Sequence, residues 1–176
     1  EVETFNAHLL NEPWEVQNNS GLYFKVFTPY WRKAFDVYKA KKYQITSLKS
    51  IDPLEHNEKT QWNFLPSKKW YQKFSNYWKP GEEEALKKLK YYINNHIDNY
   101  KEGRDRPDLD QTSRLSPHLR FGEISPRMIV NQVIKYKKLD ISSLTFLSEI
   151  GWREFSYSLL YYSCLLYTSP SPRDSG

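Results

Sequence analysis

The chain has 176 residues, the size of one compact domain, and its 16% aromatic content is enough to build a core. A net charge of +5 fits contact with nucleic acid, although a modest lysine excess is often only a solvated face. One cysteine and four histidines argue against a disulfide framework and a structural zinc site. No apolar run is long enough to span a membrane and no signal peptide is visible, so we expect a cytoplasmic monomer without metal.

Turn signals and prolines dominate the first part of the chain. Asn19-Ser20-Gly21 predicts a turn between two extended segments, Trp14–Val16 and Tyr23–Phe27. Residues 31–46 predict a helix with an apolar stripe. Residues 47–79 are broken by prolines and predict a long connector with short helical turns.

The helical body begins with Pro80-Gly81 and three glutamates, which complement the helix dipole of a first turn. Helical spacing of apolar residues then predicts one amphipathic helix over residues 81–100. Its buried face comprises Ala85, Leu89, Tyr92, Ile93, His96, Ile97 and Tyr100. We interpret His96 as a core or boundary residue.

Residues 112–126, TSRLSPHLRFGEISP, contain two Ser-Pro pairs. Ser at an N-cap followed by Pro predicts a helix start, so Ser116-Pro117 and Ser125-Pro126 should each open a helix. A helix start favours a phosphate, and further anion-binding side chains lie just upstream: Thr112, Ser113 and Arg114. The stretch is therefore a candidate pyrophosphate site, although the local chemistry alone favours two capped helices joined by a turn.

Two further helices are predicted over residues 127–138 and 144–163. The first is amphipathic and is interpreted as scaffold. On the second, four polar or aromatic residues share one side: Glu149, Trp152, Arg153 and Ser156. This grouping predicts a functional face; the alternative is a surface Glu–Arg pair beside an exposed Trp.

TSRLSPHLRFGEISPR resembles the flavin-binding signature of the DNA photolyase/cryptochrome family, and FLSEIGWREF, residues 146–155, resembles a second family motif. The segment GLYFKVFTPY, residues 21–30, resembles the family's G-x-x-Y-x-VFTPF-like segment, and the opening at Trp78 matches its W-x-PGE-x-x-A pattern. Tyr100, Arg104, Asp105 and Pro107 fit the family pattern Y-x-x-x-RD-x-P. The resemblance covers roughly residues 1–163.

The resemblance implies a mainly α fold: the first part of the helical FAD-binding domain, preceded by the end of an α/β domain and a connector. It assigns FAD binding to Tyr100, Thr112, Ser113, Leu115, Ser116 and Arg153. It assigns catalysis and substrate contact to Glu149 and Trp152. For Tyr100, packing in the last turn of its helix is the simpler alternative.

The function implied is light-driven repair of cyclobutane pyrimidine dimers in UV-damaged DNA by electron transfer from reduced FAD. Glu149, Trp152 and LRFGEIS, residues 119–125, resemble class I photolyases most. A cryptochrome-type photoreceptor without repair activity is the alternative, and a basic nucleic-acid-binding helical module without cofactor is a weaker one. The family also allows an antenna pigment of folate or deazaflavin type.

The expected domains are the end of an α/β antenna domain at 1–30, a connector at 31–80 and helical FAD-binding domain at 81–163. Residues 164–174, CLLYTSPSPRD, resemble the translation of a sequencing adapter, so residues 164–176 are predicted to be foreign to the fold; an ordinary Ser/Pro-rich tail is the alternative. Because the remaining family motifs would follow residue 163, we expect the chain alone to be inactive.

Overall fold

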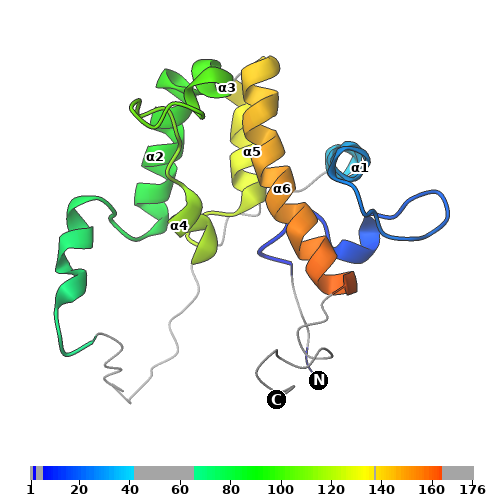
Figure 1. Cartoon of the computed structure of the whole chain (residues 1–176), viewed down its shortest axis with the longest axis horizontal. Coiled ribbons are helices and arrows are strands. Elements are labelled where there is room, and N and C mark those ends of the chain that lie inside the picture. The colour runs from blue at the N-terminus through cyan, green and yellow to red at the C-terminus, as the bar shows by residue number, and fades with distance from the viewer. Residues whose placement is uncertain (1, 3–5, 42–65, 137, 164–176) are drawn as a thin grey trace, which may run out of the picture. The chain divides into compact units, whose positions relative to one another are not determined.

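The computed structural model describes residues 2, 6–41, 66–136 and 138–163, and these contain helices and no strand (Figure 1). The expectations for residues 47–65 and 164–176 lie outside the described residues. The mainly α fold class is confirmed. The α-helices are α1 Phe27–Ala40, α2 Glu82–Asn95, α3 Tyr100–Gly103, α4 Ser116–Arg120, α5 Pro126–Tyr136 and α6 Ile141–Ser163; the 3-10 helices are η1 Pro13–Glu15, η2 Trp70–Asn76 and η3 Ile97–Asn99.

The chain divides into two units, residues 1–41 with 80–176, and residues 42–79. In the second unit the structure describes η2, a short helical turn in which Trp70 and Phe74 lie edge to face at 5.8 Å. Both rings are more than half exposed. All other helices belong to the first unit.

The two extended segments expected near the N-terminus are not strands. Pro13 begins the 3-10 helix η1, and α1 begins at Phe27, four residues before the predicted start. Pro29 lies in the first turn of α1, where a missing backbone N–H has no helical partner to lose. The turn predicted at Asn19-Ser20-Gly21 is confirmed, because the N–H of Gly21 donates to the Asn18 carbonyl at 3.0 Å. The extended interpretation of Trp14–Val16 was wrong, since Trp14 and Glu15 lie in η1, whereas in Tyr23–Phe27 the residue Val26 is extended and only Phe27 is helical.

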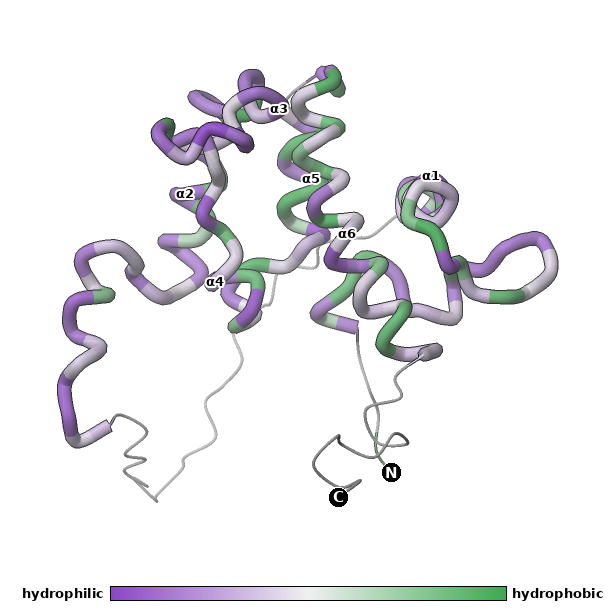
Figure 2. Tube along the Cα trace, in the orientation of Figure 1, coloured by the Kyte–Doolittle hydropathy of each residue, from purple (hydrophilic) through white to green (hydrophobic). Residues whose placement is uncertain are grey.

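Helices α1 and α6 pack against each other. Their buried cluster consists of Val16, Tyr30, Ala34 and Phe155, with Phe24, Phe27, Trp31 and Leu159 packed around it. Gly151 permits the close approach, because a Cβ there would lie 2.5 Å from two ring atoms of Trp31. Figure 2 shows hydrophobic residues recurring along α6, as a packed helix requires.

The predicted helix over residues 81–100 is interrupted. Six of its seven predicted core residues are buried, so the amphipathic face is confirmed. However, α2 ends at Asn95 because His96 has non-helical dihedral angles, and the short helices η3 and α3 follow. Tyr92 and Tyr100 then both pack on Phe146 of α6, at 4.9 and 5.3 Å between ring centroids.

The two Ser-Pro pairs behave differently. The hydroxyl oxygen of Ser125 accepts a hydrogen bond from the N–H of Met128 at 3.1 Å, which confirms it as a cap of α5. Ser116 is instead the first residue inside α4, whose N-cap is Leu115 and has no side-chain capping bond. The prediction that Ser116 caps a helix was wrong, and α4 is only five residues long.

Helix α6 starts three residues before its predicted beginning at Leu144. The Asp140 carboxylate accepts the N–H of Ser143 at 2.8 Å, and the Ser143 hydroxyl oxygen accepts the N–H of Asp140 at 2.9 Å. This reciprocal pair satisfies two free N–H groups and fixes the helix start.

Candidate functional site

One cavity of about 540 Å³ lies between the loop that leads into α4, α4 itself, α5 and α6. All six residues predicted to contact the cofactor line it, and so does Glu149. The lining residues are Tyr100, Thr112, Ser113, Arg114, Leu115, Ser116, Leu119, Arg120, Ile129, Phe146, Glu149, Ile150, Arg153 and Tyr157. The structure therefore brings together residues from 100 to 157 that the sequence separates.

The lining residues have two chemical characters. Leu119, Ile129, Phe146 and Ile150 are apolar and mostly buried. Of the others, Leu115 is apolar and Glu149 is a carboxylate, and the rest supply hydroxyl groups and three guanidinium groups, which suit an anion. An apolar cavity with a few convergent polar groups is the usual form of a small-molecule site.

The three arginines are not equivalent. Arg114 has a left-handed backbone with φ of 52° and forms an ion pair with Asp110 at 3.0 Å. Arg120, at the end of α4, is exposed and forms no ion pair within the described part of the chain. Sequence reasoning did not assign Arg120, because nothing in its local pattern showed that α4 would turn it toward this cavity.

Tyr100 lines the cavity and also packs edge to face on Phe146. Burial, followed by the nearby Glu149 carboxylate, raises the pKa of its phenol. The Arg104 guanidinium lies over its ring, 5.6 Å from the centroid. The phenol therefore stays protonated and available as a hydrogen-bond donor at neutral pH.

Glu149 forms its ion pair with Arg104, and among the described residues none is seen between Glu149 and Arg153. The bond to Glu149 raises the pKa of Arg104. Both side chains are about one-third exposed, at 32% and 34%, so the pair holds the carboxylate in place without burying it.

Arg153 is held by the N-terminal segment, a contact that sequence reasoning missed. Its guanidinium donates to the His8 carbonyl at 2.8 Å and contacts His8 Nε2 at 2.6 Å. It also reaches Glu154 at 3.3 Å and lies over the ring of Tyr157 at 5.0 Å. No sequence signal links His8 to a residue 145 positions away.

Trp152 lies outside the cavity. Its indole is 46% exposed and stacks on Phe27 at 3.7 Å between centroids, with an interplanar angle of 9°. One ring face is therefore covered by the first turn of α1. Trp152 and Arg153 consequently belong to different sides of α6, so the prediction that Trp152 shares one face with Glu149 and Arg153 was wrong.

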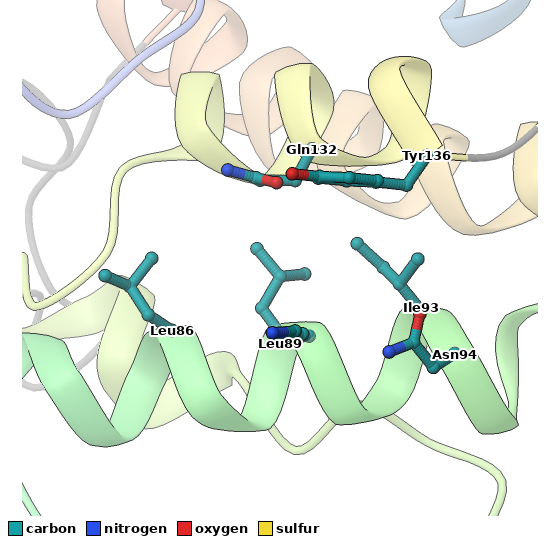
Figure 3. A pocket seen from close by; sticks show the side chains of 7 residues that line it. Leu86, Leu89, Ile93, Asn94, Gln132 and Tyr136 are labelled. Carbon is teal, nitrogen blue, oxygen red and sulfur yellow. The ribbon is translucent and has the colours of Figure 1, made fainter.

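A second cavity, of about 510 Å³, lies between α2 and α5. Figure 3 shows Leu86, Leu89 and Ile93 of α2 facing Gln132 and Tyr136 of α5. It contains no predicted site residue. Among the described residues, no cluster of side chains could hold a metal ion, and no helix is long and apolar enough to cross a membrane.

Comparisons with known proteins agree with the motifs. Residues 1–52 match the family model for DNA photolyase. The deoxyribodipyrimidine photo-lyase of Agrobacterium fabrum is 40% identical over 169 residues, covering 92% of this chain and 35% of that protein. Cryptochrome-1 of Arabidopsis thaliana is 30% identical over 177 residues, covering 88% and 25%.

A crystal structure of a bacterial class III photolyase from Agrobacterium tumefaciens superposes with a TM-score of 0.73 at 36% identity, covering 90% of this chain and 34% of that one. The described helices thus match part of the fold of a photolyase. The chain is a relative of the DNA photolyase and cryptochrome family, and it spans about a third of the length of the photolyases it matches first.

Proposed function

We propose that this chain contributes part of the FAD site and of the DNA-contacting surface of a light-driven photolyase for cyclobutane pyrimidine dimers. The observation that carries the proposal is the cavity that gathers Tyr100, Thr112, Ser113, Leu115, Ser116 and Arg153. These six residues come from three separate parts of the sequence and carry the family's flavin motifs.

The donor set of the cavity fits FAD. The hydroxyl groups of Thr112, Ser113 and Ser116 and the guanidinium of Arg120 are hydrogen-bond donors suited to phosphate oxygens. The dipole of α4 adds little because the helix has only five residues. The start of α5 lines another cavity, of about 390 Å³, so only one of the two Ser-Pro pairs faces this site.

When bound in its reduced form and excited by light, FAD would supply the electron that splits the dimer. The residues of this chain have the tasks of binding and orientation. Arg153 and the hydroxyl groups would hold the phosphates, and the protonated Tyr100 phenol would donate a hydrogen bond. The apolar side chains of Phe146 and Ile150 would keep water away from one side of the ligand.

Trp152 and Glu149 would contact a dimer turned out of the duplex. Phe27 covers one face of the indole, and the exposed part offers a surface on which a base can stack. The Glu149 carboxylate, fixed by Arg104, can accept a hydrogen bond from a base edge. Loss of such a stacking surface costs roughly 1–3 kcal/mol per base, or about a fivefold to 150-fold loss of affinity.

The photolyase subclass and the type of antenna pigment are also proposed from the family resemblance. The similar proteins include a class III photolyase and cryptochromes, so the class I assignment and the absence of a photoreceptor role stay predictions. A folate or deazaflavin antenna, a monomeric state and a cytoplasmic location stay predictions as well. The presence of both Trp152 and Glu149 in the second family motif supports repair over the photoreceptor alternative.

The test uses Arg153→Ala and Trp152→Ala in the full reading frame that encodes this chain, with Trp70→Ala as a control for loss of an exposed indole. We expect Arg153→Ala to lower flavin absorbance per protein. Trp152→Ala should keep flavin and bind a dimer-containing oligonucleotide about tenfold more weakly, at a fixed salt concentration. The reverse pattern would exchange the two roles, and bound flavin without light-driven repair in the unmutated protein would favour the photoreceptor.

A further inference from the structure

The side chain of His8 is the main contact of Arg153 outside α6. His8 belongs to the segment before η1, and its imidazole lies edge on to Tyr157 with 5.1 Å between centroids. Its Nε2 atom lies 2.6 Å from Nη2 of Arg153 and 2.7 Å from the Tyr157 hydroxyl. Its carbonyl accepts from Nη1 of the same guanidinium at 2.8 Å.

The chemistry of these contacts fixes the protonation of His8. A guanidinium has only donors, so Nε2 must be the acceptor in its contact with Arg153. The imidazole is then neutral, with its proton on Nδ1. Burial, and next the positive charges of Arg153 and Arg120, lower the pKa of His8, which agrees with this tautomer.

Some N–H groups of the Arg153 guanidinium remain for a ligand. Of the five N–H bonds of Arg153, one points to the His8 carbonyl, one to Glu154 and one to His8 Nε2. The Nε–H and one Nη2–H are without a protein partner in the described part of the chain. Arg153 lines the cavity, so a fixed guanidinium offers these two donors there.

We propose that His8 is a positioning residue: its neutral imidazole holds the Arg153 guanidinium in the orientation that binds a phosphate in the cavity. The ligand identity, FAD, rests on the proposed function, whereas the contact itself does not. Protonated His8 could not accept the hydrogen bond and would repel Arg153. Acidification should therefore release Arg153 and weaken binding.

The groups that face His8 within the described residues come from two helices. They are Arg153, Tyr157 and Glu154 of α6, and Arg120 of α4. The two arginines oppose protonation of His8, and Glu154, whose pKa is raised to about 7 by burial, is the only carboxyl group among them. Because protonated His8 would release Arg153 and weaken phosphate binding, a bound phosphate must by linkage lower the pKa of His8, which couples binding to pH.

The first measurement is ¹⁵N NMR of the histidines in the 176-residue chain. At neutral pH we expect His8 to carry its proton on Nδ1 only, and the Arg153 Nη2 protons to exchange slowly. Substitution Tyr157→Phe removes the hydroxyl but keeps the ring under the guanidinium, so the tautomer should persist. A proton on Nε2, or an unrestrained mixture of tautomers, would overturn the proposal whether or not flavin binds.

The second measurement is FAD titration across acidic to neutral pH in the full reading frame, with two variants. His8→Gln places an amide oxygen near the position of Nε2, so it should keep the neutral-pH affinity and lose the acid-induced weakening. His8→Lys places a cation beside Arg153 and should weaken binding roughly tenfold to a hundredfold at every pH, as loss of a charged hydrogen bond implies. Equal affinity in His8→Lys, or an unchanged pH step in His8→Gln, would overturn the proposal. If the unmutated protein bound no FAD, the proposed function would fail, and the NMR result would still decide the role of His8.

Discussion

Trp152 and Arg153 are consecutive residues of α6, but they belong to surfaces with different physical constraints. The Trp152 side meets α1, where Gly151 touches Trp31 and Phe155 joins the buried cluster. The Arg153 side borders the cavity with Glu149 and keeps donors free. Because neighbouring helix positions point about 100° apart, one helix can join a packed aromatic interface to an open polar site. Changes to buried residues on the packed side should therefore affect stability, and changes on the cavity side should affect flavin binding.

The largest expected effect is on the packed side. Phe155→Ala removes a ring that is 6% exposed and packs on Tyr30 and Phe27, so it should lower the free energy of unfolding by about 3–5 kcal/mol. Phe121→Ala, at a ring that is 79% exposed, is the matched control and should change it by less than about 0.5 kcal/mol. Chemical denaturation measures both. Equal effects would show that the α1–α6 interface does not stabilise the chain.

Glu154, between these two sides, should make stability depend on pH. Burial raises its pKa to about 7, against the backbone N–H of Leu10 and the charge of Arg153, which lower it. The folded protein thus binds this proton more tightly than the unfolded chain, whose reference pKa is 4.5. The resulting stability is present below pH 4.5 and is lost as pH rises to about 7, by roughly 3 kcal/mol.

Glu154→Gln keeps an oxygen for Leu10 and cannot titrate. Its stability relative to the unmutated chain should therefore improve as pH rises from about 4 to 8. His8 acts with the opposite sign, because its lowered pKa gives stability that is lost as pH falls below its ordinary value, and the comparison of variants separates the two. A constant difference between the two proteins across this range would contradict the role of Glu154.

Gly151→Ala should change the free energy of unfolding by an intermediate amount and so test how closely α1 packs on α6. The added Cβ would lie 2.5 Å from the Trp31 ring, so one helix must shift, at a cost of about 1–3 kcal/mol. Better helix propensity offsets about 1 kcal/mol of this. In a Trp31→Leu background the same change should be neutral or stabilising when unfolding is measured by denaturant. Stabilisation in the unmutated background would mean that α1 does not pack closely there.

The smallest effects distinguish the two Ser-Pro pairs. Ser125→Ala removes the cap of α5 and should cost about 1 kcal/mol, measured from thermal or denaturant unfolding. Ser116→Ala removes no capping bond and should change stability by less than about 0.5 kcal/mol, while it lowers flavin affinity in the full reading frame. A reversed order of the two stabilities would contradict the structural difference between these serines.

Local chemistry in the sequence determined much of this protein. Helical spacing of apolar residues predicted the buried face that includes Ala85, Leu89 and Ile93, because a period of 3.6 residues is a property of the backbone. The start of α5 at Ser125-Pro126 followed from a bond between neighbours. The motifs indicated the family, and the mainly α class followed from that resemblance.

Tertiary structure decided the rest, since contacts between distant segments leave no local pattern. The pairs His8–Arg153 and Arg104–Glu149 join residues 145 and 45 positions apart, and the sequence predicted neither. Ser116 shows that a local signal can also mislead. Its Ser-Pro pair predicts an N-cap, yet Leu115 precedes it as the N-cap of α4. Whether a polar side chain caps a helix, pairs with a charge or lines a cavity depends on which segments fold against it.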